Sequence, residues 1–286
     1  MRMRSYAAAI GMAVTLLAPT LQAQTPDLKQ LLHDMANSLG MLRTLQELDS
    51  VMTVEYWGTG TMRMGTAGAP VQLKSYYAQI AYDFPGMRVD ITRATGQREI
   101  QVVSGTFAWN EVGKIGGGLD PSWASATPAM DAVSDRLLRL WTTPFGVVKA
   151  AVAAGAATKV TVEGGATVVT FPLANGMPGQ TVYMVVGDLN GTPVKVTLDR
   201  DHRPARVEVR YRDKVYVTTY SNYGDLNEKD YQADIFLPAR VVQTVDGQTV
   251  LDLTIEKSNT YNPYVIMPVP ETVGKAAAPS SSPPLR

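Results

Sequence analysis

Most of this chain alternates apolar and polar residues with a period of two, and this pattern constrains the fold more than any other feature. Successive residues of a strand point to opposite faces of a sheet, so the alternation predicts strands with one dry and one wet face. In "RVEVRYR" (206–212), Val207, Val209 and Tyr211 share one face and the charged residues share the other. Comparable runs recur from Val51 onward, and together they predict about eleven antiparallel strands.

Short turn sequences separate these runs. The pairs Gly164-Gly165 and Asp246-Gly247 predict tight hairpins, because their residue types tolerate the positive φ that such turns require. The segments "DRDHRP" (199–204) and "RDK" (212–214) indicate two further reversals.

Two regions have helical spacing instead. The segment 24–40, "QTPDLKQLLHDMANSLG", repeats Leu and Met at steps of three and four, with Thr25 expected as its cap and Gly40 at its end. The segment 127–155 keeps helical spacing across Pro144, which must break or kink the helix because proline lacks the amide hydrogen.

A sheet of this length is expected to curl. The predicted fold is mainly β with α, a long curled antiparallel half-barrel covered by the N-terminal helix and the proline-broken helix. Because 286 residues can bury one large core, we expect a single domain at residues 24–272, followed by a disordered Pro/Ser-rich tail at 273–286.

The first 23 residues predict a secretory signal peptide. Arg2 and Arg4 precede an apolar run, and cleavage is expected after Ala23. The run is shorter than the roughly 20 residues that a membrane-spanning helix needs. We therefore expect a protein of the periplasm or the medium that is not an integral membrane protein after cleavage.

Composition excludes several kinds of chemistry. The chain has no cysteine, which excludes disulfides, a cysteine nucleophile and a lipid anchor on cysteine. Its 26 basic and 26 acidic residues cancel, so no nucleic-acid partner is predicted. Only His33 and His202 are available, which excludes a histidine-rich metal centre. We predict no catalytic residue, no metal site and no cofactor.

Acidic residues offer no clear catalytic pair. The candidates lie beside apolar neighbours in alternating runs, which places most of them on the wet face: Asp83, Asp90, Glu99, Glu111, Asp252 and Glu256. His202 follows Asp199 and Asp201, and a solvated turn of mixed charge accounts for that cluster.

Aromatic and apolar residues suggest an apolar pocket between helix and sheet. The candidate ligand-binding residues are Tyr56, Trp57, Trp109, Leu137, Trp141 and Phe145. The alternative is that these side chains simply fill the core. A cavity of about 300 Å³ or more would favour binding, and a packed interior would count against it.

Several stretches together resemble a known family. These are "YDFPGMRVDITR" (82–93), "REIQVVSGTFAWNEVG" (98–113), "DRLLRLWTTPFGVVKAA" (135–151), "TTYSNYGDL" (218–226) and "LPARVVQTVDGQTVLDLTIEKSNTYNP" (237–263). They look like the N-terminal accessory domain of secreted bacterial metallo-β-lactamase-fold hydrolases. In that family, the piece similar to "IMPVPETV" (266–273) leads into a hydrolase domain with an H-x-H-x-D-H motif, which this sequence lacks. The resemblance therefore implies the accessory half on its own.

The predicted architecture is also similar to the periplasmic lipoprotein carriers of the LolA and LolB type, an analogy of fold alone. Two functions follow as hypotheses. The chain is a non-catalytic binding module with a pocket for a lipid, acyl chain or lipoprotein, or it is a scaffold domain that docks on a separately encoded protein partner such as a metallohydrolase. A hydrolase that depends on His202 stays as a third hypothesis.

Overall fold

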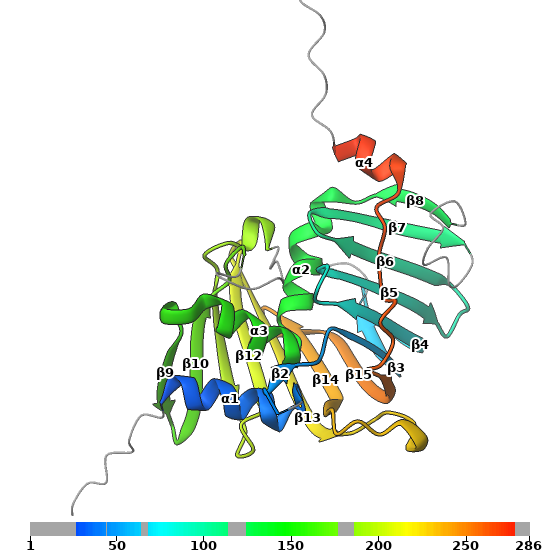
Figure 1. The fold of residues 1–286 in the computed structure, drawn as a ribbon. Coiled ribbons are helices and arrows are strands. Elements are labelled where there is room, and N and C mark those ends of the chain that lie inside the picture. The colour runs from blue at the N-terminus through cyan, green and yellow to red at the C-terminus, as the bar shows by residue number, and fades with distance from the viewer. Residues whose placement is uncertain (1–26, 44, 64–67, 114–123, 177–185, 278–286) are drawn as a thin grey trace, which may run out of the picture.

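The computed structural model describes residues 27–43, 45–63, 68–113, 124–176 and 186–277. The predicted signal peptide and the expected cap Thr25 lie outside this part. The described strands form a 13-stranded antiparallel sheet and a separate small hairpin (Figure 1). The predicted class, a long curled antiparallel sheet with helices, is confirmed. Within the described residues, no helix combines the length and the apolar character needed to cross a bilayer.

The large sheet consists of two meanders that meet at its centre. The first meander contains β3 (Thr53–Arg63), β4 (Pro70–Ala81), β5 (Gly86–Arg93), β6 (Arg98–Ser104), β7 (Phe107–Gly113) and β8 (Ala124–Pro128). The second contains β9 (Lys159–Glu163), β10 (Ala166–Pro172), β11 (Pro193–Leu198), β12 (Pro204–Tyr211), β13 (Lys214–Gly224), β14 (Leu237–Val245) and β15 (Gln248–Asn259). They join because β15 pairs with β3, which leaves β8 and β9 as the outer edges.

The predicted hairpin turns are present. Gly164 and Gly165 link β9 to β10, and Asp246 and Gly247 link β14 to β15, all four with positive φ. Residues 212–213 also have positive φ, between β12 and β13. These turns hold β9 with β10, β12 with β13 and β14 with β15 in register.

Two glycines allow β3 and β15 to approach closely. A Cβ on Gly58 would overlap the carbonyl oxygen of Thr254, and one on Gly60 would overlap that of Asp252. The register also shifts between Gly58 and Gly60 on the β4 side, which indicates a bulge that bends the strand. The junction of the two meanders is therefore both tight and curved.

The proline-broken helix crosses between the two outer edges of the sheet. It consists of α2 (Val133–Trp141) and α3 (Pro144–Ala154), as the sequence predicts, with Pro144 in the first turn of α3 and Thr143 as its cap. The Thr143 hydroxyl accepts a hydrogen bond from the Gly146 amide at 3.2 Å. Helices α2 and α3 connect β8 to β9 and lie over the concave face of the sheet (Figure 1).

The N-terminal helix α1 (Leu28–Ser38) packs beside α3. Its cap is Asp27, whose carboxylate accepts a hydrogen bond from the Gln30 amide at 3.3 Å. Leu31, Met35 and Leu39 of its apolar stripe are buried in the main core. A small hairpin of β1 (Leu42–Arg43) and β2 (Leu48–Asp49) follows.

The outer face of the first meander is not the wet surface that the alternation predicts. After β15 the chain turns back and runs across this face to α4 (Glu271–Ala277) (Figure 1). Val265, Met267 and Val273 form a second apolar cluster with Val102 and Trp109.

Charged side chains on this outer face are buried as a network. Asp90 is 5% exposed and binds Arg98, while Glu111 binds Arg88 at 3.0 Å. The expected solvation of Asp90 and Glu111 is therefore wrong, because the C-terminal segment covers their face. Paired charges can tolerate such burial, since each partner replaces lost water contacts.

The C-terminal segment also moves a predicted boundary. The tail expected from residue 273 begins inside α4, and Val273 is fully buried against β7 and β8. Residues 278–286 lie outside the described part of the chain.

Candidate functional site

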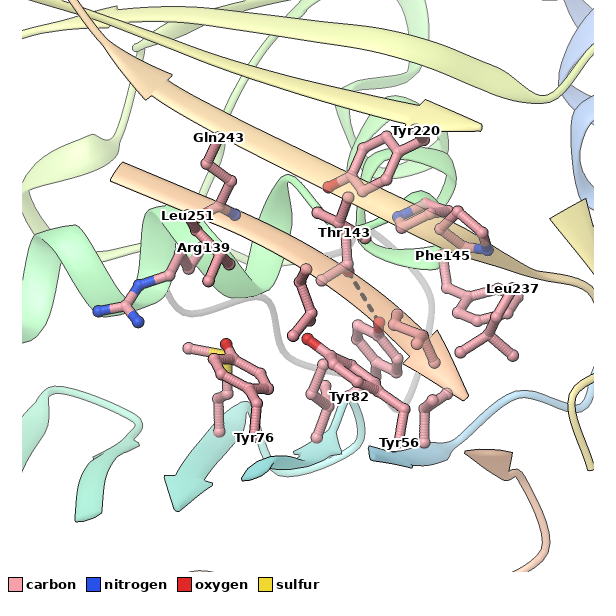
Figure 2. Close-up of a pocket in the computed structure, with 18 residues that line it drawn as sticks. Tyr56, Tyr76, Tyr82, Arg139, Thr143, Phe145, Tyr220, Leu237, Gln243 and Leu251 are labelled. Carbon is pink, nitrogen blue, oxygen red and sulfur yellow. Dashed lines mark hydrogen bonds between the residues drawn. The ribbon is translucent and has the colours of Figure 1, made fainter. Parts of the chain in front are cut away.

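A cavity of about 40 Å³ lies on the concave face, below the break between α2 and α3 (Figure 2). It sits where the two meanders join. Its lining comes from β3, β4 and β5 on one side, from β13, β14 and β15 on the other, and from the helix break above. The lining is mainly apolar, with residues such as Val54, Ile80 and Leu253.

Four tyrosines supply most of the polar groups around this cavity: Tyr56, Tyr76, Tyr82 and Tyr220. The rings of Tyr56 and Tyr76 stack with centroids 6.1 Å apart and planes inclined by 12°. The Tyr220 hydroxyl donates to the carbonyl of Thr142 at 2.6 Å. Burial raises the pKa of all four phenols, so they remain neutral hydrogen-bonding groups at physiological pH.

Of the described side chains that line the cavity, Arg139 is the one that carries a charge. It projects from α2, is half-buried, and donates to Gln101 Oε1 at 3.0 Å. A guanidinium in this position can bind a carboxylate or phosphate at the end of an otherwise apolar ligand.

A groove of about 200 Å³ lies beside the cavity, between α2 and strands β12 to β15. The cavity and the groove share Arg139, Gln243 and Leu251 as lining residues, so the two spaces lie next to each other. At the groove wall, the Tyr216 hydroxyl donates to Asp135 at 3.2 Å. Burial and the neighbouring Asp135 carboxylate raise the pKa of Tyr216 to about 12.

Helix α2 is held firmly on the side away from the groove. The buried guanidinium of Arg136 donates to the carbonyls of Val102 and Trp109, at 2.7 and 2.6 Å, and to Asn110. Burial lowers the pKa of Arg136 to about 10, so it remains protonated at neutral pH. These bonds anchor α2 to β6 and β7.

The structure brings only part of the predicted site together. Tyr56 and Phe145 line the cavity. Trp141 is fully buried behind it, with its ring 6.3 Å from that of Tyr82, and Leu137 is fully buried in the main core. The core-packing alternative describes Trp141 and Leu137 better than a ligand contact does.

The other two predicted residues face the outer side of the sheet. Trp57 stacks on Tyr77 with centroids 4.6 Å apart. Trp109 is buried under the C-terminal segment, and its indole donates to Glu111 at 3.0 Å. Strand alternation separates these residues from the concave face, because Trp57 follows Tyr56, which faces the cavity.

Sequence reasoning did not single out Tyr76, Tyr82, Arg139 or Tyr220. The sequence does contain an indication for Tyr76 and Tyr82. An even number of residues separates Tyr76, Ile80 and Tyr82, so strand alternation along β4 and its turn places all three on one face. Arg139 carries no such signal, since a charged residue on an amphipathic helix is usually solvated.

The volumes fall short of the expected 300 Å³. The cavity has room for only a few water molecules, and the groove adds about 200 Å³ of open space.

The turn that contains His202 is held by Asp199. The Asp199 carboxylate accepts hydrogen bonds from the backbone amides of Asp201 and Arg203, both at 2.9 Å. Among the described residues, no three His, Cys, Asp or Glu side chains group as a metal site would.

No family model matches the chain, and no curated protein matches, so nothing found supports the predicted link to metallo-β-lactamase-fold hydrolases. The crystal structure of the lipoprotein LppX from Mycobacterium tuberculosis aligns with a TM-score of 0.24 and 12% identity, over 65% of this chain and 90% of LppX. That of LprF from Mycobacterium bovis aligns with a TM-score of 0.27 and 12% identity, over 81% and 93%. At these scores neither alignment carries an argument about function.

Proposed function

We propose that this protein is a non-catalytic binding module for an elongated apolar ligand, such as a lipid or a single acyl chain. The observation that carries the proposal is a mainly apolar groove beside α2 that adjoins the cavity at Arg139, Gln243 and Leu251. The apolar part of the ligand lies along the groove, between α2 and strands β12 to β15. Its polar end group lies at Arg139, where the groove meets the cavity.

Arg139 gives the site a preference for an anionic end group. It is half-buried at the junction of groove and cavity, where reduced access of water strengthens its attraction for a carboxylate. The neutral tyrosines around it can add hydrogen bonds without adding charge.

The test uses the full chain purified without detergent and 11-(dansylamino)undecanoic acid as the probe. Val250 lines the groove and is half-buried, so Val250→Trp should fill the groove and weaken probe binding at least about tenfold. Val162→Trp is the matched control, because Val162 is 41% exposed and does not line the groove. A protein that binds no probe, or two variants with equal affinity, would refute the proposal.

Arg139→Gln tests the end-group preference separately. This variant should lose affinity for the acid probe and keep its affinity for the methyl ester of that probe. Equal losses for both probes would show that Arg139 acts only by shaping the groove.

Docking on a separately encoded partner stays a prediction of the sequence, to be tested by co-purification from periplasmic extract. The prediction of export depends on the signal peptide expected at residues 1–23, which lies outside the described part of the chain. Determining the N-terminal sequence of the mature protein would test it.

A further inference from the structure

A second groove, of about 420 Å³, lies on the other side of the sheet from the cavity. Its walls come from β3, the end of β15, the β13–β14 loop and the segment after β15. The lining residues are Trp57, Asn227, Glu228, Tyr231, Lys257, Ser258, Asn259, Tyr261 and Asn262. We name it the outer groove, and it shares no lining residue with the cavity or with the groove beside α2.

One wall of the outer groove contains the Trp57 ring, which packs against two neighbouring side chains. The Trp57 ring stacks on Tyr77, with planes inclined by 9°, and Lys257 Nζ lies 5.2 Å from its centroid. Both ring faces are therefore occupied, and only part of the indole is left to contact a ligand. Beneath it, the buried carboxylate of Glu55 accepts hydrogen bonds from the side-chain amides of Asn259 and Asn262, each at 3.1 Å.

Two tyrosine rings of the outer groove remain largely open to solvent. Tyr231 is 64% exposed and Tyr261 is 46% exposed. The Tyr261 backbone is held by a hydrogen bond from its amide to Asn259 Oδ1 at 3.0 Å. Exposed aromatic rings beside fixed polar groups present both an apolar face and hydrogen-bonding partners to one ligand.

The outer groove carries no net charge that would select an ion. Its two charged residues, Glu228 and Lys257, form an ion pair with each other. A ligand of this groove therefore needs apolar C–H surface for the tyrosine rings and neutral hydroxyl or amide groups for the polar walls. A sugar ring has both properties, and about 420 Å³ is within the size range of small-ligand sites.

From this combination we propose that the outer groove is a binding site for a neutral saccharide. The C–H face of a sugar ring packs on Tyr231 or Tyr261, because the electron-rich face of an aromatic ring attracts polarised C–H groups. The hydroxyls of the sugar bond with Glu228, Lys257 and the tyrosine hydroxyls.

The experiment titrates the full chain with cellobiose, maltose and N,N′-diacetylchitobiose by calorimetry. At least one disaccharide should bind with a Kd of about 1 mM or tighter, and Tyr231→Ala and Tyr261→Ala should each weaken it about tenfold. Tyr264→Ala is the matched control, since Tyr264 is 79% exposed and does not line the outer groove. All three substitutions remove exposed rings, so folding should persist, and circular dichroism checks that it does.

Binding of none of the three disaccharides at about 10 mM, or variants that bind as the unaltered chain does, would overturn the proposal. The result is independent of the cavity on the concave face. Val250→Trp should leave disaccharide binding unchanged, and loss of acyl-probe binding should not accompany Tyr261→Ala.

Discussion

The Tyr82 hydroxyl lies 2.8 Å from the Thr143 hydroxyl, and this pair ties the helix break to the sheet. Thr143 Oγ1 also caps α3 and donates to the carbonyl of Leu140 at 2.6 Å. The proline break and the floor of the cavity are therefore held by one small hydrogen-bonded cluster. Movement of either element would disturb the other.

Tyr82→Phe should lower the free energy of unfolding by about 0.5–1.5 kcal/mol, the usual net value of one hydrogen bond. The ring would keep its contact with Trp141, so no cavity would form. Urea denaturation measures the change. An unchanged midpoint would mean that the Tyr82 hydroxyl contributes nothing to holding the break.

Trp141→Ala should cost on the order of 3–5 kcal/mol, because this fully buried ring would leave a large void between α2 and the sheet. Trp57→Ala is the matched comparison and should cost less, since Trp57 is half-buried on the outer face. A small loss for Trp141→Ala, with altered binding of the dansyl probe, would identify the helix as a mobile lid. A large loss in a protein that never binds an apolar probe would end the carrier hypothesis.

Val273→Ala should lower the free energy of unfolding by about 1.5 kcal/mol, because it removes two buried methyl groups from the cluster around Trp109. Ile266→Ala should cost less, since Ile266 is 40% exposed. Removal of residues 278–286 should change stability little. Equal, negligible effects of all three changes would show that α4 does not stabilise the domain.

His33 should titrate above its ordinary pKa of 6.5, because Glu47 accepts a hydrogen bond from its ring at 2.9 Å and Asp34 is nearby. The resulting stabilisation is fully present below pH 6.5 and is lost as the pH rises through the raised pKa. Glu47→Gln should move the pKa back toward 6.5, as followed by proton NMR. The chain has two histidines, so His202→Asn assigns the signals. A pKa that does not respond to Glu47→Gln would contradict this origin of the shift.

Strand alternation, the hairpin turns and the break at Pro144 could all be predicted from the sequence. Each depends on a few adjacent residues, such as the positive φ of Asp246-Gly247 or the missing amide hydrogen of Pro144. The curled sheet covered by the N-terminal helix and the proline-broken helix followed from adding these local elements together. Tyr56 and Phe145 line the cavity, and their contact with a ligand stays a prediction.

Other features depend on contacts between distant parts of the chain. Pairing of β15 with β3 joins the two meanders and thereby creates the cavity. Alternation along the strands predicts that Trp109 and Asp90 share the face opposite to the helices, but it does not predict what covers that face. The C-terminal segment covers it, and so decides that Trp109 packs in an outer cluster and that Asp90 is a buried ion-pair partner. Local periodicity fixes which way each side chain points, whereas only the folded chain determines what each side chain meets.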